Sequence, residues 1–231
     1  MALVNLFPLS IAAKTLESPP IHEYQKMSQK IQELVPPNLE RNEWFGDSAM
    51  HDCVHLLPEF DWLTSQVERL CTQYVYDLGY DTRQLSLFHH RSWLNLFRTG
   101  GVAAPHKHHS SDLTFVYYFH KDQRSHGGEL IFENVHYQNR IIRGLDQGRQ
   151  RHLFRESNEH NFTSMTFPTE TGNYFIFPSN TTHLSGVLTE YGEPMIIITY
   201  DVMITTKLNV HPLKYEFIPP HPINYQEFKN V

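Results

Sequence analysis

The chain has 231 residues, of which 40% are hydrophobic and 19% are charged, and its formal net charge is −6. These values are typical of one folded globular domain, and they exclude a disordered chain or a polycation that binds nucleic acid by general charge attraction. Cys53 and Cys71 are the only cysteines, which excludes a disulfide framework and a cysteine zinc site and indicates a reducing compartment, here expected to be the cytoplasm.

The opening segment MALVNLFPLSIAAK is apolar. It lacks a basic start, is interrupted by Pro8 and is too short to cross a bilayer, so it does not have the features of a signal peptide or a membrane span. We expect it to form a buried strand or arm.

Two helices are predicted next along the chain. Over residues 22–35 the apolar side chains fall at helical spacing until a pair of prolines ends the pattern. A second apolar stripe runs over residues 61–78. Asp61 is expected to cap its first turn, and Gly79 is expected to end it.

After the second helix the apolar period changes from that of a helix to that of a strand. Over residues 85–97, Trp93, Asn95 and Phe97 alternate with two leucines and therefore share one face. Further strands are predicted over residues 113–119, 129–133, 162–167, 173–177 and 194–204, between turns rich in glycine and proline. Short strands in this number indicate a mainly β fold, a sandwich or small barrel.

Two segments lack strand or helix patterns. Residues 134–161 form a polar insertion that contains five arginines, and it is either a solvated loop or a lid that meets an anionic substrate or partner. The proline-rich tail, residues 206–231, could pack on the body or on a second subunit. We therefore divide the single domain into an arm with helices (1–82), a β core (83–205) that carries the insertion, and the tail.

Candidate metal ligands gather in the segment PHKHHSSDLTFVYYFH, residues 105–120. His106 and His108 are two residues apart, which puts both imidazoles on the same side of an extended chain. Asp112 follows them, and His183 comes after GNYFIFPSNTTH, where a distant strand of the same barrel can bring it close. Three ligands on one side leave open coordination positions, as redox-active non-haem iron requires.

The order of these motifs resembles the iron(II)- and 2-oxoglutarate-dependent oxygenase superfamily, and most closely a family of putative oxygenases common in phage and marine bacterial genomes. The matching pieces are NLFPLS, SWLNLFRTGGVAAPHKHHSSDLTFVYYF, GGELIFE, GNYFIFPSNTTH and PMIIITYDV, which together cover most of residues 1–205. The resemblance implies a double-stranded β-helix, a jelly-roll or cupin-like barrel with the N-terminal helices packed outside. It also implies a dioxygenase that uses Fe(II) and 2-oxoglutarate.

The metal-binding pattern differs from the one that is usual in this superfamily. The usual set is His-x-Asp or His-x-Glu followed by a distal histidine, whereas His108 occupies the position of the acid here. The pattern is also similar to that of cupins, which share the barrel and use His-x-His, an acid and a distal histidine. We expect His106, His108 and His183 as ligands, with Asp112 as a fourth ligand or as a group that orients one of them.

The anchor for 2-oxoglutarate also differs. Related oxygenases usually hold its distal carboxylate with an arginine on the strand after the distal histidine, and Met195 stands at that place here. Residues 184–206 contain no lysine or arginine. A planar guanidinium suits a carboxylate, so Arg98, Arg91 or Lys107 would be the nearest basic replacements.

Other residues are expected around the co-substrate. Tyr118 and Asn95 resemble positions that hydrogen-bond 2-oxoglutarate in related enzymes. The aromatic residues expected to line or support a dry pocket are Trp93, Phe97, Phe115 and Phe177.

The sequence therefore predicts an Fe(II)/2-oxoglutarate-dependent hydroxylase of an unidentified substrate, by analogy a protein side chain such as proline. One alternative is a cupin-like metalloenzyme that does not use 2-oxoglutarate, and the other is a non-catalytic β-helix binding protein. The expected partners are the small-molecule co-substrate, the substrate and, in a homodimer, a second copy of the chain; neither a membrane nor nucleic acid is expected.

Overall fold

The computed structural model describes residues 8–35, 53–135, 154–156, 158, 160–189, 193–207 and 226–229. These residues contain two α-helices, α1 (Ile21–Leu34) and α2 (Asp61–Asp77), and the short 3-10 helices η1 (Val54–Leu56), η2 (Pro58–Phe60) and η3 (Thr82–Gln84). The strands are β1 (Ala12–Thr15), β2 (Leu85–Phe97), β3 (Leu113–His120), β4 (Leu130–Glu133), β5 (Ser164–Phe167), β6 (Asn173–Pro178), β7 (His183–Ser185), β8 (Met195–Thr206) and β9 (Gln226–Glu227).

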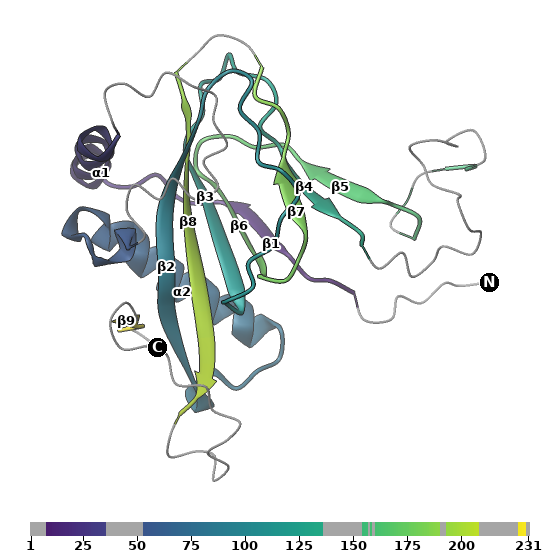
Figure 1. Ribbon diagram of the computed structural model, residues 1–231. Coiled ribbons are helices and arrows are strands. Elements are labelled where there is room, and N and C mark those ends of the chain that lie inside the picture. The colour runs from purple at the N-terminus through teal and green to yellow at the C-terminus, as the bar shows by residue number, and fades with distance from the viewer. Residues whose placement is uncertain are drawn as a thin grey trace.

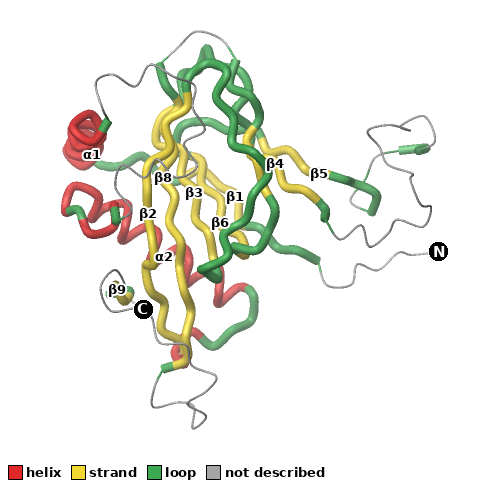
Figure 2. The backbone as a smooth tube through the Cα atoms, in the orientation of Figure 1, coloured by secondary structure: helices red, strands yellow, loops and turns green. Residues whose placement is uncertain are grey.

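The strands form two antiparallel sheets. The larger has the order β1-β6-β3-β8-β2-β9, and the smaller has the order β5-β4-β7. The long strands β2 and β8 run side by side over most of their length (Figure 2). The helices cover one face of the large sheet, and the small sheet lies on its other side (Figure 1). The predicted mainly β fold with helices packed outside is confirmed.

Helix α2 packs on the sheet through the stripe that predicted it. Leu63, Val67 and Cys71 are fully buried and belong to the same apolar core as the large sheet's helix-facing residues. Gly79, at a φ of 95°, follows the helix as expected, because this backbone region favours glycine. The expectation for Asp61 was wrong: it is the first helical residue, and the preceding Phe60 makes no side-chain cap. Its carboxylate still lies at the positive end of the helix dipole.

Alternation along the strands separates two cores. On β3, Phe115, Tyr117 and Phe119 pack toward the helices, whereas Val116 and Tyr118 pack between the two sheets. The expectation that Phe115 borders the pocket was therefore wrong, because the period of two places it on the helix side. The space between the sheets is where a ligand pocket can form.

The strands predicted from the sequence all occur, with ends that differ by at most two residues. The short strands β7 and β9 were not predicted, because two or three residues carry too little pattern. The opening segment contributes β1, which is largely exposed and not buried as expected. No helix in the described ranges is both long and apolar enough to span a membrane.

Most of the arginine-rich insertion and of the proline-rich tail lies outside the described residues. In the insertion, Arg155 is described and pairs with Glu156 at 2.6 Å. In the tail, β9 pairs with β2, and Phe228 is buried in the helix-side core. This part of the tail packs on the body, as one of the two expectations for it stated.

Candidate metal centre

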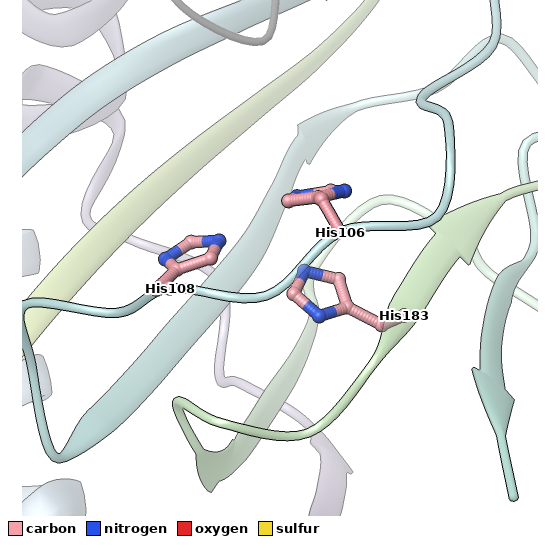
Figure 3. A group of neighbouring side chains, drawn as sticks. All are labelled: His106, His108 and His183. Carbon is pink, nitrogen blue, oxygen red and sulfur yellow. The ribbon is translucent and has the colours of Figure 1, made fainter. Parts of the chain in front are cut away.

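The backbone around His106 is tied to β7. His106 and His183 exchange two backbone hydrogen bonds, each of 2.9 Å, from the amide of one to the carbonyl of the other. The amide of His108 donates to the carbonyl of Ser179 at 2.8 Å. The loop between β2 and β3 is therefore held to the barrel, and it carries two histidines toward a third (Figure 3).

Three imidazoles meet at this point. One nitrogen from each of His106, His108 and His183 lies within 4.8 Å of the others. His183 is 4% exposed, and the other two are half-buried. Imidazole nitrogens grouped in this way, with solvent on one side, suit a transition metal that keeps open coordination positions.

Each imidazole is also fixed through its Nδ1 atom. The Nδ1 of His106 lies 2.7 Å from the carbonyl oxygen of Ala104, and that of His183 lies 2.9 Å from the carbonyl oxygen of Thr181. The Nδ1 of His108 lies 2.6 Å from Asp201 Oδ1. Since all three partners are acceptors, each Nδ1 carries the proton and each Nε2 offers its lone pair.

Asp201, on β8, was missed by the sequence analysis. Its carboxylate is 2% exposed, and it accepts a second hydrogen bond from Thr114 at 3.2 Å. A usable signal was present, because Thr199 and Asp201 are polar residues at a period of two within a mainly apolar segment. That period places both on the face that lines the pocket.

Two predicted site residues lie elsewhere. Asp112 is exposed, and its Oδ2 accepts a hydrogen bond from the backbone amide of Ile204 at 2.7 Å. It is not part of the imidazole group, and the orienting contact expected of it is made by Asp201. Arg98 is exposed in the turn after β2 and is not among the residues that line the pocket.

The imidazoles open into a pocket of about 260 Å³ between the sheets. Asn95 and Tyr118, both predicted, line it, and the Asn95 amide donates to Thr199 Oγ1 at 3.2 Å. The deeper wall is apolar, and Lys107 and His109 lie at the exposed mouth. Trp93 and Phe97 also line the pocket, while Phe177 supports it by packing against the His183 ring.

The protonation of His183 is strongly biased by its surroundings. Burial, with a smaller contribution from the positive charge that His106 can carry, lowers the pKa of His183 to about 3. The ring is therefore neutral at physiological pH, as a metal ligand must be.

This pKa predicts how the metal-free protein responds to acid. In an unfolded chain the pKa of histidine is about 6.5, so below that pH the unfolded state binds the extra proton. The contribution of His183 to stability is complete above about pH 6.5 and is lost as the pH falls toward 3. We expect a loss of about 2 kcal/mol in the free energy of unfolding between pH 6.5 and 5.

The measurement is urea denaturation of the metal-free wild type and of His183→Gln at pH 7.5 and 5. Burial also lowers the pKa values of His89 and His90, but these residues are present in both proteins. The stability of the wild type relative to the variant should therefore be lower at pH 5. Equal differences at the two pH values would contradict the prediction.

Comparison with protein families gives a match over residues 91–193 to a family described as "Putative 2OG-Fe(II) oxygenase". The matched segment contains all three histidines of the imidazole group. Comparison with curated proteins gives no match. The resemblance to the 2-oxoglutarate and iron(II) oxygenase superfamily seen in the sequence is confirmed.

Solved structures share the fold. The epimerase SnoN from nogalamycin biosynthesis, solved with Fe3+, alpha ketoglutarate and nogalamycin RO, has a TM-score of 0.56 at 14% identity, with 96% of this chain and 94% of that chain covered. HygX from Streptomyces hygroscopicus, with nickel and 2-oxoglutarate bound, has a TM-score of 0.51 at 10% identity, with 84% and 83% covered.

A third solved structure is matched over part of its length. An oxidoreductase of the 2OG-Fe(II) oxygenase family from Burkholderia pseudomallei has a TM-score of 0.43 at 12% identity, with 64% of this chain covered, and the chain spans 59% of that protein. The likeness to SnoN and HygX, with TM-scores above 0.5, concerns the fold alone at these identities, and this fold is the double-stranded β-helix expected from the sequence.

Proposed function

We propose that the chain is a non-haem Fe(II)- and 2-oxoglutarate-dependent dioxygenase that hydroxylates a carbon of its substrate. The observation that carries the proposal is the convergence of His106, His108 and His183, each oriented through Nδ1, at the mouth of a pocket inside this barrel. The family match over the same residues supports it.

The donor set fits iron. Neutral imidazoles are good ligands for Fe(II), and three on one side leave positions for a co-substrate and oxygen. When bound, the metal would supply oxygen activation coupled to the conversion of 2-oxoglutarate into succinate and CO2. Asp201 supports this set, because its negative charge beside His108 Nδ1 makes that imidazole a stronger donor. It partly replaces the charge that a carboxylate ligand would bring.

The rest of the pocket positions organic ligands. The Asn95 side chain bridges Trp93 and Thr199, accepting from the indole at 3.2 Å and donating to the hydroxyl at 3.2 Å, so its amide is held rigidly in the wall. The apolar wall keeps water from the reacting atoms. We propose an uncharged substrate side chain presented at the mouth, with peptidyl proline as the class to test first.

The three neutral imidazoles also support a second candidate, a cupin-like metalloenzyme that does not use 2-oxoglutarate. Such an enzyme would need no anchor for a distal carboxylate, and Met195 is no such anchor. Its mark is metal-dependent turnover without formation of succinate. The third possibility, a non-catalytic barrel, predicts an incomplete metal site, and the grouping of three oriented imidazoles argues against it.

The test is spectroscopic. The protein is purified without oxygen, given Fe(II) and then 2-oxoglutarate, and examined for the weak visible charge-transfer band of a chelated complex. A band in the wild type that is absent in His183→Ala supports the oxygenase. Iron binding without a band favours the cupin-like enzyme, and no iron binding contradicts both.

A further inference from the structure

If the pocket binds 2-oxoglutarate, a group other than the usual arginine must hold the distal carboxylate, because Met195 occupies the arginine position after the distal histidine. Met195 is 1% exposed and lies against the turn that precedes β4. A Cβ atom on Gly128 would come within 2.8 Å of the Met195 sulfur. An arginine at position 195 would therefore extend toward the turn around Gly128.

A different cation reaches the same turn. Lys121 follows β3, and its Nζ donates to the carbonyl oxygens of Gly127 at 2.7 Å and Thr169 at 2.8 Å and to Thr169 Oγ1 at 3.1 Å. These acceptors are all uncharged, so the hydrogen bonds hold the ammonium without neutralising it. Burial lowers the pKa of Lys121, and the nearby carboxylates of Glu129 and Glu170 offset only part of this effect.

Tyr118 connects this ammonium with the pocket. Its side chain is fully buried and lines the pocket, and its hydroxyl lies 3.4 Å from the Gly128 carbonyl oxygen. Thr169 Oγ1 donates to the same carbonyl at 3.0 Å, so the two hydroxyls share the Gly128 oxygen as acceptor. Tyr118 is therefore the member of this group that lines the pocket, and Thr169 and Lys121 lie behind it. A contact of 3.4 Å is weak, so the phenol hydrogen can turn to a better acceptor.

We propose that Lys121, acting with Tyr118 and Thr169, replaces the missing guanidinium and recognises the distal carboxylate of 2-oxoglutarate. This inference rests on the proposed function. The phenol donates directly to the carboxylate, and the partly buried ammonium stabilises the carboxylate charge from behind Tyr118 and Thr169. Two of the other basic candidates are less suited, because Arg98 is exposed and Lys107 lies at the mouth beside the metal ligands. Arg91 also lines the pocket, where its guanidinium lies over the Trp93 ring, 5.3 Å from the ring centroid.

The test compares two 2-oxo acids on the Fe(II)-loaded protein without oxygen. 2-Oxopentanoate has the same five-carbon chain and 2-oxo acid group as 2-oxoglutarate but lacks the distal carboxylate. We expect the wild type to bind 2-oxoglutarate at least about tenfold more tightly in calorimetric titrations, and Lys121→Met to lose this preference. The affinity for 2-oxopentanoate should stay within about twofold of the wild type, because its single carboxylate binds at the metal.

Matched variants separate recognition from a structural effect. Lys14→Met removes an exposed lysine on β1 and should leave both affinities unchanged. Adding Met195→Arg to Lys121→Met should restore the preference for 2-oxoglutarate, because it puts a guanidinium on β8, the strand that pairs with β3. If Lys121→Met does not fold, Tyr118→Phe tests the same contacts and should weaken the binding of 2-oxoglutarate but not that of 2-oxopentanoate.

The outcomes distinguish failure of the inference about Lys121 from failure of the proposed function. If the wild type prefers 2-oxoglutarate and Lys121→Met keeps that preference, the inference is wrong and the proposed function stands. If the iron-loaded wild type binds neither acid, the proposed function fails. A selective loss in Lys121→Met, with iron binding retained, supports the inference.

Discussion

Replacing His183 with alanine is expected to lower the affinity for Fe(II) by more than about 100-fold, which is the upper range for loss of a group that only supports a ligand. His183 is held by β7 and by its contact to Thr181, so its nitrogen is already placed for a metal. Anaerobic titration with Fe(II), or with Co(II) as a spectroscopic substitute, measures the loss.

A matched histidine provides the control for this change. His109 is exposed next to His108 and is not part of the imidazole group. His109→Ala should therefore bind metal within about twofold of the wild type, as expected for a surface substitution away from the site. Similar losses in the two variants would mean that the metal is held by a different set of residues.

The parts of the site that the sequence predicted are those that depend on local periodicity. His106 and His108 point to one side because they are two residues apart in an extended loop, and Trp93, Asn95 and Phe97 share a face for the same reason. His183 follows a strand whose pattern was recognisable. These features require only the immediate neighbours in the chain.

The site residues that the sequence did not predict are positioned by pairing between strands that are far apart in the chain. Asp201 was overlooked because it is far from His108 in sequence, yet β8 pairs with β3 and places Asp201 opposite Thr114, close to the His108 ring. Asp112 is near in sequence, but its carboxylate turns to the amide of Ile204. The proposed role of Lys121 was not predicted for the same reason, since only the tertiary structure brings its amine to Thr169.

The carboxylate of Asp201 is expected to have the second large effect on metal affinity. Asp201→Asn is expected to lower metal affinity about 10- to 100-fold, the range found when a group that orients a ligand is altered. Asparagine keeps the volume and one acceptor oxygen but removes the charge beside His108 Nδ1. The amide can also turn its NH2 group toward Nδ1, which would favour the tautomer that places the proton on Nε2, where the metal should bind.

The same chemical change on the surface is the control, because Asp112→Asn removes a carboxylate that lies nearby in sequence and outside the imidazole group. Metal titrations of both variants, with the visible spectrum of the Co(II) form, separate an effect on the ligands from a general loss of charge. If Asp112→Asn proved the more damaging variant, a ligand role for Asp112 would have to replace the arrangement described above. If Asp201→Asn alone weakens binding, the negative charge that usually comes from a carboxylate ligand acts here through the His108 ring.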